Sequence, residues 1–265
     1  MESPGTGAFM RNRRLESLLD TSSGQRIGET PKMSGKEEPE RKPRTDVFAD
    51  DDGQFPTRIR HGNIYGHVTG KMLMWILGNP IKIEGAEYNN EKAIYISNHA
   101  SPIDIFLIMW LTPTGTVGIA KKEIIWYPLF GQLYVLANHL RIDRSNPTAA
   151  IESMKEAARA ILENSLSLII FPEGTRSRNG RLLPFKKGFV HLAIQTRLPI
   201  VPMVLVGTHK AWRKGSLHVR PAPLTIKYLP PISTENWKVD KIDDYVKMLH
   251  DIYAENLPES QRPLP

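Results

Sequence analysis

Short apolar runs recur along the chain between residues 93 and 229, and longer stretches with a helical pattern separate some of them. Five of these runs have the length and the aliphatic content that are typical of buried strands. They cover residues 93–97, 116–120, 165–171, 200–206 and 224–229. Strands separated by helices favour an α/β fold with a central sheet, mostly parallel or mixed, that is flanked by helices.

Two stretches have the pattern of helices. Residues 146–164 place apolar side chains along one face, with Asn146 as a candidate N-cap. Residues 63–79 combine aromatic and aliphatic side chains with few charges, and they predict a helix that ends before the next proline. Within it, Gly66 and Gly70 allow a neighbouring element to pack closely.

The chain divides by composition near residue 57. Residues 1–56 mix Gly, Ser, Pro and balanced charges with few large apolar residues, so we expect this segment to be disordered. Residues 57–265 are long enough for one domain with a sizeable core. The apolar run at residues 72–77 is far shorter than the ~18 residues that cross a bilayer, and we expect no transmembrane helix.

The charge of the chain indicates anionic partners. The formal net charge is +7, and beyond residue 60 the chain carries 24 Lys and Arg against 17 Asp and Glu. Nucleic acid, an anionic membrane and a phosphorylated substrate all fit this excess. The absence of cysteine excludes disulfides, thiolate zinc sites and a thiol nucleophile.

The stretch "YISNHASPID", residues 95–104, follows a predicted strand and carries His99 and Asp104 five positions apart. Asp104 falls in the first turn of a predicted helix that begins near Ser101. One interpretation is a capping box, in which Asp104 only satisfies backbone N–H groups. The other is that Asp104 orients the His99 ring as a general base. No serine nucleophile motif is present, so the substrate's own hydroxyl would be the nucleophile.

A second polar stretch, "IIFPEGTRSRNGRLLPFKKG" at residues 169–188, follows another predicted strand. It combines a glycine turn with five cations, which suit a phosphate dianion, although such a loop can also be only a solvated surface. Glu173 lies between strand and turn, where it could orient Arg176. The five cations are Arg176, Arg178, Arg181, Lys186 and Lys187.

Two further stretches have less specific patterns. Residues 118–146 pair Lys121 with a wide apolar surface and include Arg144; their aromatic residues fit a core or a membrane interface. His139 lies within an apolar-periodic segment, and we interpret it as structural. Pro202 interrupts the predicted strand at 200–206, which indicates an edge or a bulge.

Four such motifs in this order are specific. The chain resembles the glycerolipid acyltransferase superfamily, whose signature Asn-His-x-x-x-x-Asp corresponds to Asn98, His99 and Asp104. The resemblance covers roughly residues 57–262. Within it, the sequence is most similar to the seed-type plant 1-acyl-glycerol-3-phosphate acyltransferases of the endoplasmic reticulum. Members of that group usually have a long hydrophobic segment upstream of the motif, where this chain has "FADDDGQFPTRIRHGN".

The resemblance implies a role for each motif residue. His99 would be the general base and Asp104 its partner. An acceptor site would include Glu173, Gly174, Thr175 and Arg176, with Arg176 on the phosphate. Lys121 and Arg144 would assist phosphate binding, and Pro202 would belong to acyl-donor binding.

The resemblance also implies the reaction. An acyl group would pass from acyl-coenzyme A to the sn-2 hydroxyl of lysophosphatidate, giving phosphatidate and coenzyme A without an acyl-enzyme. Acyl-coenzyme A and lysophosphatidate would be the substrates, and no metal or bound cofactor is implied. Residues 57–265 would form the acyltransferase domain.

Three alternatives stay open. The motif does not define the acceptor, so another lysophospholipid could be acylated. The charge excess and the aromatic residues would also suit a non-catalytic module on anionic membranes. Nucleic-acid binding is disfavoured because no reader motif is present. We expect a membrane surface as partner, at the endoplasmic reticulum, with residues 63–79 and 123–137 in the interface, and we identify no protein partner.

Overall fold

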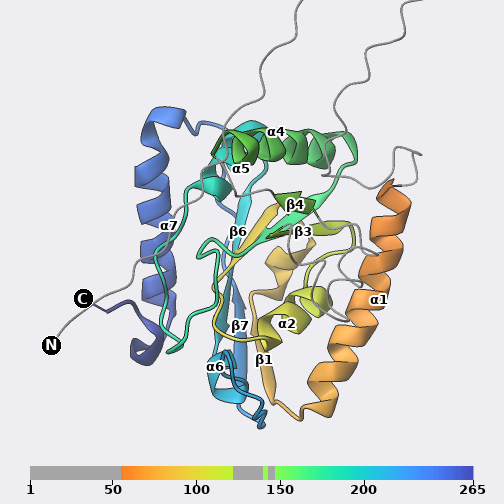
Figure 1. Cartoon of the computed structure of the whole chain (residues 1–265), viewed down its shortest axis with the longest axis vertical. Coiled ribbons are helices and arrows are strands. Elements are labelled where there is room, and N and C mark those ends of the chain that lie inside the picture. The colour runs from red at the N-terminus through yellow and green to blue at the C-terminus, as the bar shows by residue number, and fades with distance from the viewer. Residues whose placement is uncertain (1–54, 122–139, 143–146, 265) are drawn as a thin grey trace, which may run out of the picture. The chain divides into compact units, whose positions relative to one another are not determined.

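The structure is a computed structural model that describes residues 55–121, 140–142 and 147–264 (Figure 1). Its helices are α1 (Phe55–Ile76), α2 (Ile103–Leu111), α4 (Pro147–Glu163), α5 (Gly188–Thr196), α6 (Thr208–Ala211) and α7 (Ile242–Asn256). Its strands are β1 (Ile81–Glu84), β2 (Ile94–Ser97), β3 (Thr116–Lys121), β4 (Leu140–Ile142), β5 (Ser167–Ile170), β6 (Ile200–Val206) and β7 (Leu224–Tyr228). Short 3-10 turns cover Ala86–Asn90, Val239–Lys241 and Glu259–Gln261.

The described strands form one mixed sheet of seven strands in the order β1-β7-β6-β2-β5-β3-β4. The five strands from β6 to β4 are parallel to one another. Strand β7 is antiparallel to β6, and β1 is parallel to β7. The predicted α/β class, with a partly parallel sheet flanked by helices, is therefore confirmed.

All five predicted strands are present, and two strands were missed. The missed strands, β1 and β4, lie at the two edges of the sheet. Strand β1 has the sequence "IKIE" with two exposed residues at its centre, and β4 has only three residues. Neither forms a continuous apolar run, whereas every residue of β2 and β5 is buried because helices cover both faces there.

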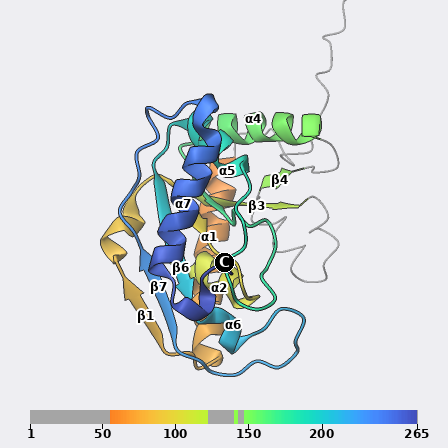
Figure 2. The same ribbon diagram turned by 90° about the vertical axis from the view of Figure 1, so that its left-hand side faces the viewer.

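Two apolar cores lie on the two faces of the sheet. Ile94 and Ile96 of β2 belong to one core with residues of α4, α5 and α7 and with Ile59 of α1, whereas Tyr95 between them belongs to the other core, with Met74 of α1 and residues of α2. Figure 1 shows α7 and α1 on opposite sides of the sheet, and Figure 2 shows α7 in front of β6 and β7. The alternation along β2 follows from the two-residue repeat of a strand.

Helix α1 differs in its bounds from the helix that the sequence predicts over residues 63–79. It begins at Phe55. The polar stretch before residue 63 contains Ile59, whose side chain packs in the core with no exposed surface and so stabilises the additional helical turns. It ends at Ile76, because Gly78 adopts a left-handed backbone with φ 64° and donates its N–H to Trp75 O.

Close packing of α1 on α2 depends on Gly70. A methyl group at this position would lie 2.6 Å from the carbonyl oxygen of Phe106 in α2. At Gly66 the nearest atoms, which belong to Met109, would lie at 3.6 Å, an ordinary contact distance. The predicted close packing is therefore confirmed at Gly70, whereas at Gly66 the distances do not require glycine.

Tyr253 of α7 joins the two central strands of the sheet. Its hydroxyl group donates to the carbonyl oxygen of Ile96 in β2 at 2.5 Å and accepts the N–H of Met203 in β6 at 3.1 Å. Burial raises the pKa of this phenol well above its ordinary value, so the group stays a neutral donor. The bridge holds β2 and β6 together close to where both strands approach the functional edge described below.

Two expectations concern the membrane and the N-terminal segment. In the described part of the chain, no helix combines the length and the apolar content needed to cross a bilayer. Residues 1–54 lie outside the described residues, so disorder there stays a prediction, while Phe55 and Pro56 already belong to α1. The segment 123–137 and His139 lie outside the described residues as well.

Candidate active site

Strands β6, β2 and β5 are neighbours and run in the same direction, so their carboxyl ends lie at one edge of the sheet. His99 follows β2, Glu173 follows β5, and Gly207 follows β6. Ligands of open α/β sheets bind at this edge, beyond the carboxyl ends of the strands. The topology therefore brings the two polar stretches found in the sequence together.

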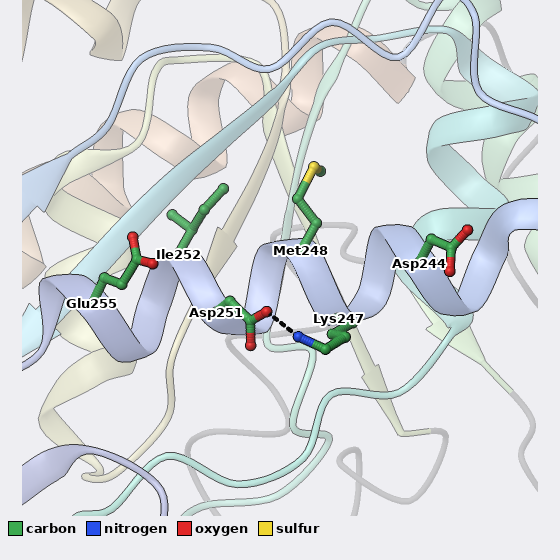
Figure 3. A pocket seen from close by; sticks show the side chains of 6 residues that line it. All are labelled: Asp244, Lys247, Met248, Asp251, Ile252 and Glu255. Atoms are coloured by element: carbon green, nitrogen blue, oxygen red, sulfur yellow. Dashed lines mark hydrogen bonds and ion pairs between the residues drawn. The ribbon is translucent and has the colours of Figure 1, made fainter.

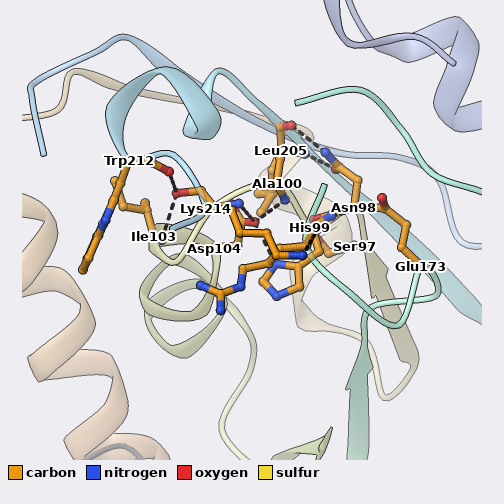
Figure 4. A network of polar contacts seen from close by, with 12 residues as sticks. Ser97, Asn98, His99, Ala100, Ile103, Asp104, Glu173, Leu205, Trp212 and Lys214 are labelled. Carbon is orange, nitrogen blue, oxygen red and sulfur yellow. Dashed lines mark hydrogen bonds and ion pairs between the residues drawn. The ribbon is translucent and has the colours of Figure 1, made fainter. Parts of the chain in front are cut away.

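Asn98 ties the loop after β2 to β6. Its side-chain amide donates to the carbonyl oxygen of Leu205 at 2.9 Å, and its Oδ1 accepts the Leu205 N–H at 2.7 Å. Figure 4 shows this pair beside His99. The Asn98 side chain thus continues the strand pairing beyond Ser97, and this explains why an amide side chain precedes the histidine.

The imidazole of His99 is held by a buried carboxylate and a stacked ring. Its Nδ1 lies 2.8 Å from Oδ2 of Asp104, whose side chain has no exposed surface. The ring stacks on Phe171, with 3.9 Å between the ring centroids and 15° between their planes. Because a carboxylate only accepts hydrogen bonds, Nδ1 carries a proton, and in the neutral imidazole the lone pair is therefore on Nε2. No partner for Nε2 exists among the described residues, and the side chain is 12% exposed.

Asp104 fulfils both of the interpretations that the sequence left open. Besides His99 Nδ1, its Oδ2 accepts the backbone N–H groups of Ala100 at 2.7 Å and of Ser101 at 2.8 Å. The Ser101 hydroxyl group accepts the N–H of Ile103 and donates to the carbonyl oxygen of Trp212. The start of α2 and the orientation of the imidazole therefore depend on the same carboxylate.

Glu173 holds the backbone of His99 and does not pair with Arg176. Its Oε1 accepts the His99 N–H at 2.6 Å, and its Oε2 accepts the Leu183 N–H at 2.9 Å. The carbonyl oxygen of His99 in turn accepts the N–H of Ser177 at 2.8 Å. Both backbone groups of His99 are thus bound by the loop after β5. The prediction that Glu173 orients Arg176 is wrong, because both carboxylate oxygens of Glu173 bind backbone N–H groups.

Burial has a large electrostatic effect on Glu173. It raises the pKa of this carboxyl group to about 8; the nearby Asp104 carboxylate also raises it, and the two N–H donors oppose the shift. The charged form is disfavoured because little water reaches the group, which is 3% exposed. Near neutral pH, Glu173 is therefore partly protonated, and it lies beside the loop that carries His99.

The turn after Glu173 presents Thr175 and Arg176 to the surface. Gly174 has φ 69°, and a methyl group on it would lie 2.9 Å from Cε of Lys186. Its N–H donates to the carbonyl oxygen of Phe171, which closes the turn. Glycine is required here because an L side chain rarely adopts this backbone conformation.

The five cations of this stretch separate into different roles. Arg181 donates to the carbonyl oxygens of Glu259 and Arg262, and Lys187 pairs with Asp243. These two contacts are structural. The guanidinium groups of Arg176 and Arg178 have no carboxylate partner among the described residues.

Lys214, which lies after α6, is a further residue of this region that no motif in the sequence indicates. Its Nζ donates to the carbonyl oxygen of Arg176 at 2.7 Å and to Oγ1 of Thr175 at 3.2 Å. The sequence offers only the basic pair "RK" at residues 213–214, a short distance beyond the strand that contains Pro202. Its contact with the Arg176 turn forms because β6 and β5 are the two neighbours of β2 in the sheet. A local sequence pattern does not contain this strand order.

Pro202 does not lie at an edge or a bulge, as its sequence context indicated. Strand β6 is internal, and Pro202 is in regular parallel register with Ile96 of β2. The strand tolerates it because pairing with β7 begins one residue later, at Met203; Pro202 contributes only its carbonyl oxygen, which accepts the N–H of Leu229. The missing N–H falls at the end of that ladder.

The other predicted residues are placed only in part. Lys121 is the last residue of β3 and pairs with Ile142 of β4, so it ends a strand at the functional edge. Its side chain lies outside the described residues, as does all of Arg144. Within the described residues, no group of three or more His, Asp or Glu side chains could hold a metal ion.

A surface hollow of about 440 Å³ occurs elsewhere, along α7 (Figure 3). Its lining residues are Asp244, Lys247, Met248, Asp251, Ile252 and Glu255, all from this one helix. Three carboxylates against one ammonium group would repel an anionic ligand. This hollow does not contribute to the histidine site.

Comparisons with known proteins agree with this arrangement. A family model described as "Acyltransferase" matches residues 80–206. The 1-acyl-sn-glycerol-3-phosphate acyltransferase of Cocos nucifera is 58% identical over 298 residues, which cover 100% of this chain and 96% of that protein. The Limnanthes douglasii protein of the same name is 72% identical over 207 residues, 78% of this chain and 74% of that protein.

A solved structure has a similar fold. The crystal structure of the 1-acyl-sn-glycerophosphate (LPA) acyltransferase from Thermotoga maritima matches with a TM-score of 0.60 and 25% identity. The match covers 77% of this chain and 80% of that one. The comparison therefore extends well beyond the signature residues to most of the chain.

The raised pKa of Glu173 predicts a stability that falls with pH. The folded state binds a proton up to about pH 8, whereas the unfolded carboxyl group loses it near pH 4.5. This group's contribution to the free energy of unfolding therefore decreases as pH rises from 4.5 to 8. A Glu173→Gln variant lacks this dependence, and it costs about 1–3 kcal/mol at pH 5–6, because its amide NH₂ faces a backbone N–H.

The measurement is denaturant unfolding from pH 5 to pH 9. We expect the stability difference between wild type and Glu173→Gln to shrink as pH rises. The control is Glu255→Gln on the exposed surface of α7, which should leave the pH dependence unchanged. Parallel curves for wild type and Glu173→Gln would contradict the raised pKa.

Proposed function

We propose that this chain, which belongs to the family of 1-acyl-sn-glycerol-3-phosphate acyltransferases, transfers a fatty acyl group from acyl-coenzyme A to the sn-2 hydroxyl of lysophosphatidate. The products are phosphatidate and free coenzyme A. The observation that carries the proposal is the pairing of His99 Nδ1 with the buried Asp104 carboxylate, which leaves Nε2 as the free base. Arg176 and Arg178, which have no carboxylate partner in the described part of the chain, suit a phosphorylated acceptor. They flank Ser177, whose N–H binds the carbonyl oxygen of His99.

In the proposed reaction, Nε2 of His99 removes the proton of the acceptor hydroxyl as its oxygen attacks the thioester carbonyl. The tetrahedral intermediate collapses by breaking the carbon–sulfur bond, and the imidazolium returns its proton to the departing thiolate. Asp104 keeps the proton on Nδ1 and stabilises the imidazolium while it exists. Coenzyme A therefore leaves as a thiol, and no outside proton donor is required.

The engagement of the nearby serine supports direct transfer without an acyl-enzyme. Ser101 is fully buried, and its hydroxyl group is used between Ile103 N–H and Trp212 O. It starts α2 and is not aimed at the imidazole. The acceptor hydroxyl is the nucleophile that the proposal requires.

The acceptor phosphate is proposed to bind at the turn after β5. Arg176 is partly exposed and has no carboxylate partner among the described residues. Its loop is joined to the His99 loop by the hydrogen bond from Ser177 N–H to the His99 carbonyl oxygen. Thr175 and the Gly174 backbone shape this turn, and Glu173 contributes by holding the His99 backbone. Lys121 and Arg144 stay proposed phosphate ligands, and Pro202 a proposed part of acyl-donor binding, on the basis of the family resemblance.

Helix α1 supports a proposed contact with a membrane surface. Its face away from α2 exposes six apolar side chains: Ile64, Tyr65, Val68, Met72, Trp75 and Ile76. Trp75 is 81% exposed and Tyr65 75% exposed, and large aromatic residues favour the lipid–water interface. The acceptor and the product are membrane lipids, so a helix lying in the interface would bring the site to them. We propose that this membrane is the endoplasmic reticulum, as the resemblance to the plant enzymes implies.

His99→Ala should reduce turnover to the detection limit while the protein stays folded. General-base assistance contributes about 10²- to 10⁴-fold, and no other described side chain takes the position of Nε2. The measurement is release of free thiol from acyl-coenzyme A in the presence of lysophosphatidate, together with thermal unfolding. The matched control is His218→Ala, an exposed histidine beyond α6. Turnover of His99→Ala within a few-fold of wild type would end the assignment.

Replacing Val68 and Trp75 by serine should weaken vesicle binding by about tenfold or more. Each side chain removes apolar surface from water when the helix enters the interface, and a tenfold change in affinity corresponds to about 1.4 kcal/mol. The measurement is co-sedimentation with phospholipid vesicles. Leu217→Ser is the control, because Leu217 is 95% exposed but lies outside α1. Binding of the α1 variant equal to wild type would show that this face does not meet the membrane.

A further inference from the structure

Lys214 comes from the third loop of the functional edge, the one that follows β6 and α6. Its ammonium group crosses to the loop after β5, where it bonds to the Arg176 carbonyl oxygen and to the Thr175 hydroxyl group. Figure 4 shows Lys214 in the same group of side chains as His99 and Asp104. Lys214 therefore lies against the turn that carries the proposed phosphate ligand Arg176, and the next residue of this turn, Ser177, binds the carbonyl oxygen of His99.

The charges around Lys214 are unbalanced. An ammonium group has three N–H donors, and two of them reach neutral oxygens of the turn. Burial lowers the pKa of Lys214, and the positive charges of Arg176 and Arg178 lower it further. Three cations thus gather here, and none of them forms an ion pair with a carboxylate in the described part of the chain.

Three other lysines, all on exposed surfaces, have carboxylate partners instead. Lys82 pairs with Glu84, Lys187 with Asp243 and Lys247 with Asp251. Those ion pairs are on exposed surfaces, where they contribute little. At Lys214 the like charges repel one another, and a bound dianion would remove that repulsion while using the remaining N–H donor.

We infer that the Lys214 ammonium group contacts the phosphate of the acceptor and sets a preference for a phosphomonoester over a phosphodiester headgroup. This inference rests on the proposed function, because it concerns the acceptor of that reaction. A phosphomonoester carries close to two negative charges at neutral pH, since its second pKa is near 6, whereas a phosphodiester carries one. Three clustered cations attract a dianion more strongly than a monoanion. Loss of one cation therefore weakens the binding of the dianion more than that of the monoanion.

A purely structural role for Lys214 makes a different prediction. If the ammonium group served only to join the loop after α6 to the Arg176 turn, its loss would disturb the site for every acceptor alike. The two roles therefore differ in how a neutral side chain changes the selectivity between acceptors. They also differ in whether a guanidinium group can substitute, because Arg provides charge and donors in a different geometry.

The test uses Lys214→Met, with Lys214→Gln as a second neutral variant in case the first folds poorly. Thiol release is measured with lysophosphatidate and with lysophosphatidylcholine at saturating acyl-coenzyme A. We expect the KM for lysophosphatidate to rise about tenfold or more, with kcat and the KM for acyl-coenzyme A changed by less than about threefold. Selectivity for lysophosphatidate over lysophosphatidylcholine should fall correspondingly, and Lys214→Arg should recover most of it.

A pH profile and a matched control sharpen the test. In the wild type, the KM for lysophosphatidate should decrease between pH 5 and pH 7.5 as the phosphate gains its second charge, and this decrease should be shallower in Lys214→Met. The control is Lys210→Met, because Lys210 is exposed on α6 and its side chain has no role in the site. An unchanged KM, or an equal loss with both acceptors, would overturn the inference.

Failure of the proposed function would be distinguishable from failure of this inference. If wild type and Lys210→Met do not acylate lysophosphatidate, the proposed function is wrong. Titration with glycerol 3-phosphate, followed by calorimetry, then decides the role of Lys214 alone. Binding about tenfold weaker in Lys214→Met supports the contact with a phosphomonoester, and equal binding in both proteins overturns it.

Discussion

One buried oxygen atom, Oδ2 of Asp104, receives three hydrogen bonds at 2.7–2.8 Å. Two come from the backbone of Ala100 and Ser101, just before α2, and the third comes from the imidazole of His99. A carboxylate with no exposed surface is costly unless it is hydrogen-bonded, so these contacts form together. The same carboxylate therefore positions the imidazole and binds the N–H groups of the two residues before the N-cap of α2.

The surrounding contacts turn this local motif into a rigid site. Asn98 binds the loop to β6 through Leu205, and Glu173 and Ser177 bind both backbone groups of His99 to the loop after β5. Three neighbouring parallel strands are therefore connected above their carboxyl ends (Figure 4). Such preorganisation lowers the cost of placing a base against a substrate hydroxyl. The same loop after β5 carries Arg176 and Arg178, which have no carboxylate partner among the described residues.

The sequence predicted much of this and missed parts for identifiable reasons. The five strands with continuous apolar runs, the helix at Pro147–Glu163 and the family resemblance are confirmed. The edge strands β1 and β4 could not be predicted from continuous apolar runs, because β1 is too polar and β4 is too short. Pro202 was misplaced because its missing N–H falls at the end of a ladder, which depends on where β7 begins. The contacts of Glu173 and Lys214 join loops that only the strand order brings together.

The most direct test of the account is the turnover of Asp104→Asn, measured as thiol release from acyl-coenzyme A with lysophosphatidate. The amide keeps the size of the side chain but removes the charge that stabilises the imidazolium. The account predicts a loss of about 10²-fold or more in kcat, with thermal unfolding showing a folded protein and the KM for lysophosphatidate little changed. A kcat within about threefold of the wild type would contradict it, because His99 would then need no carboxylate to act.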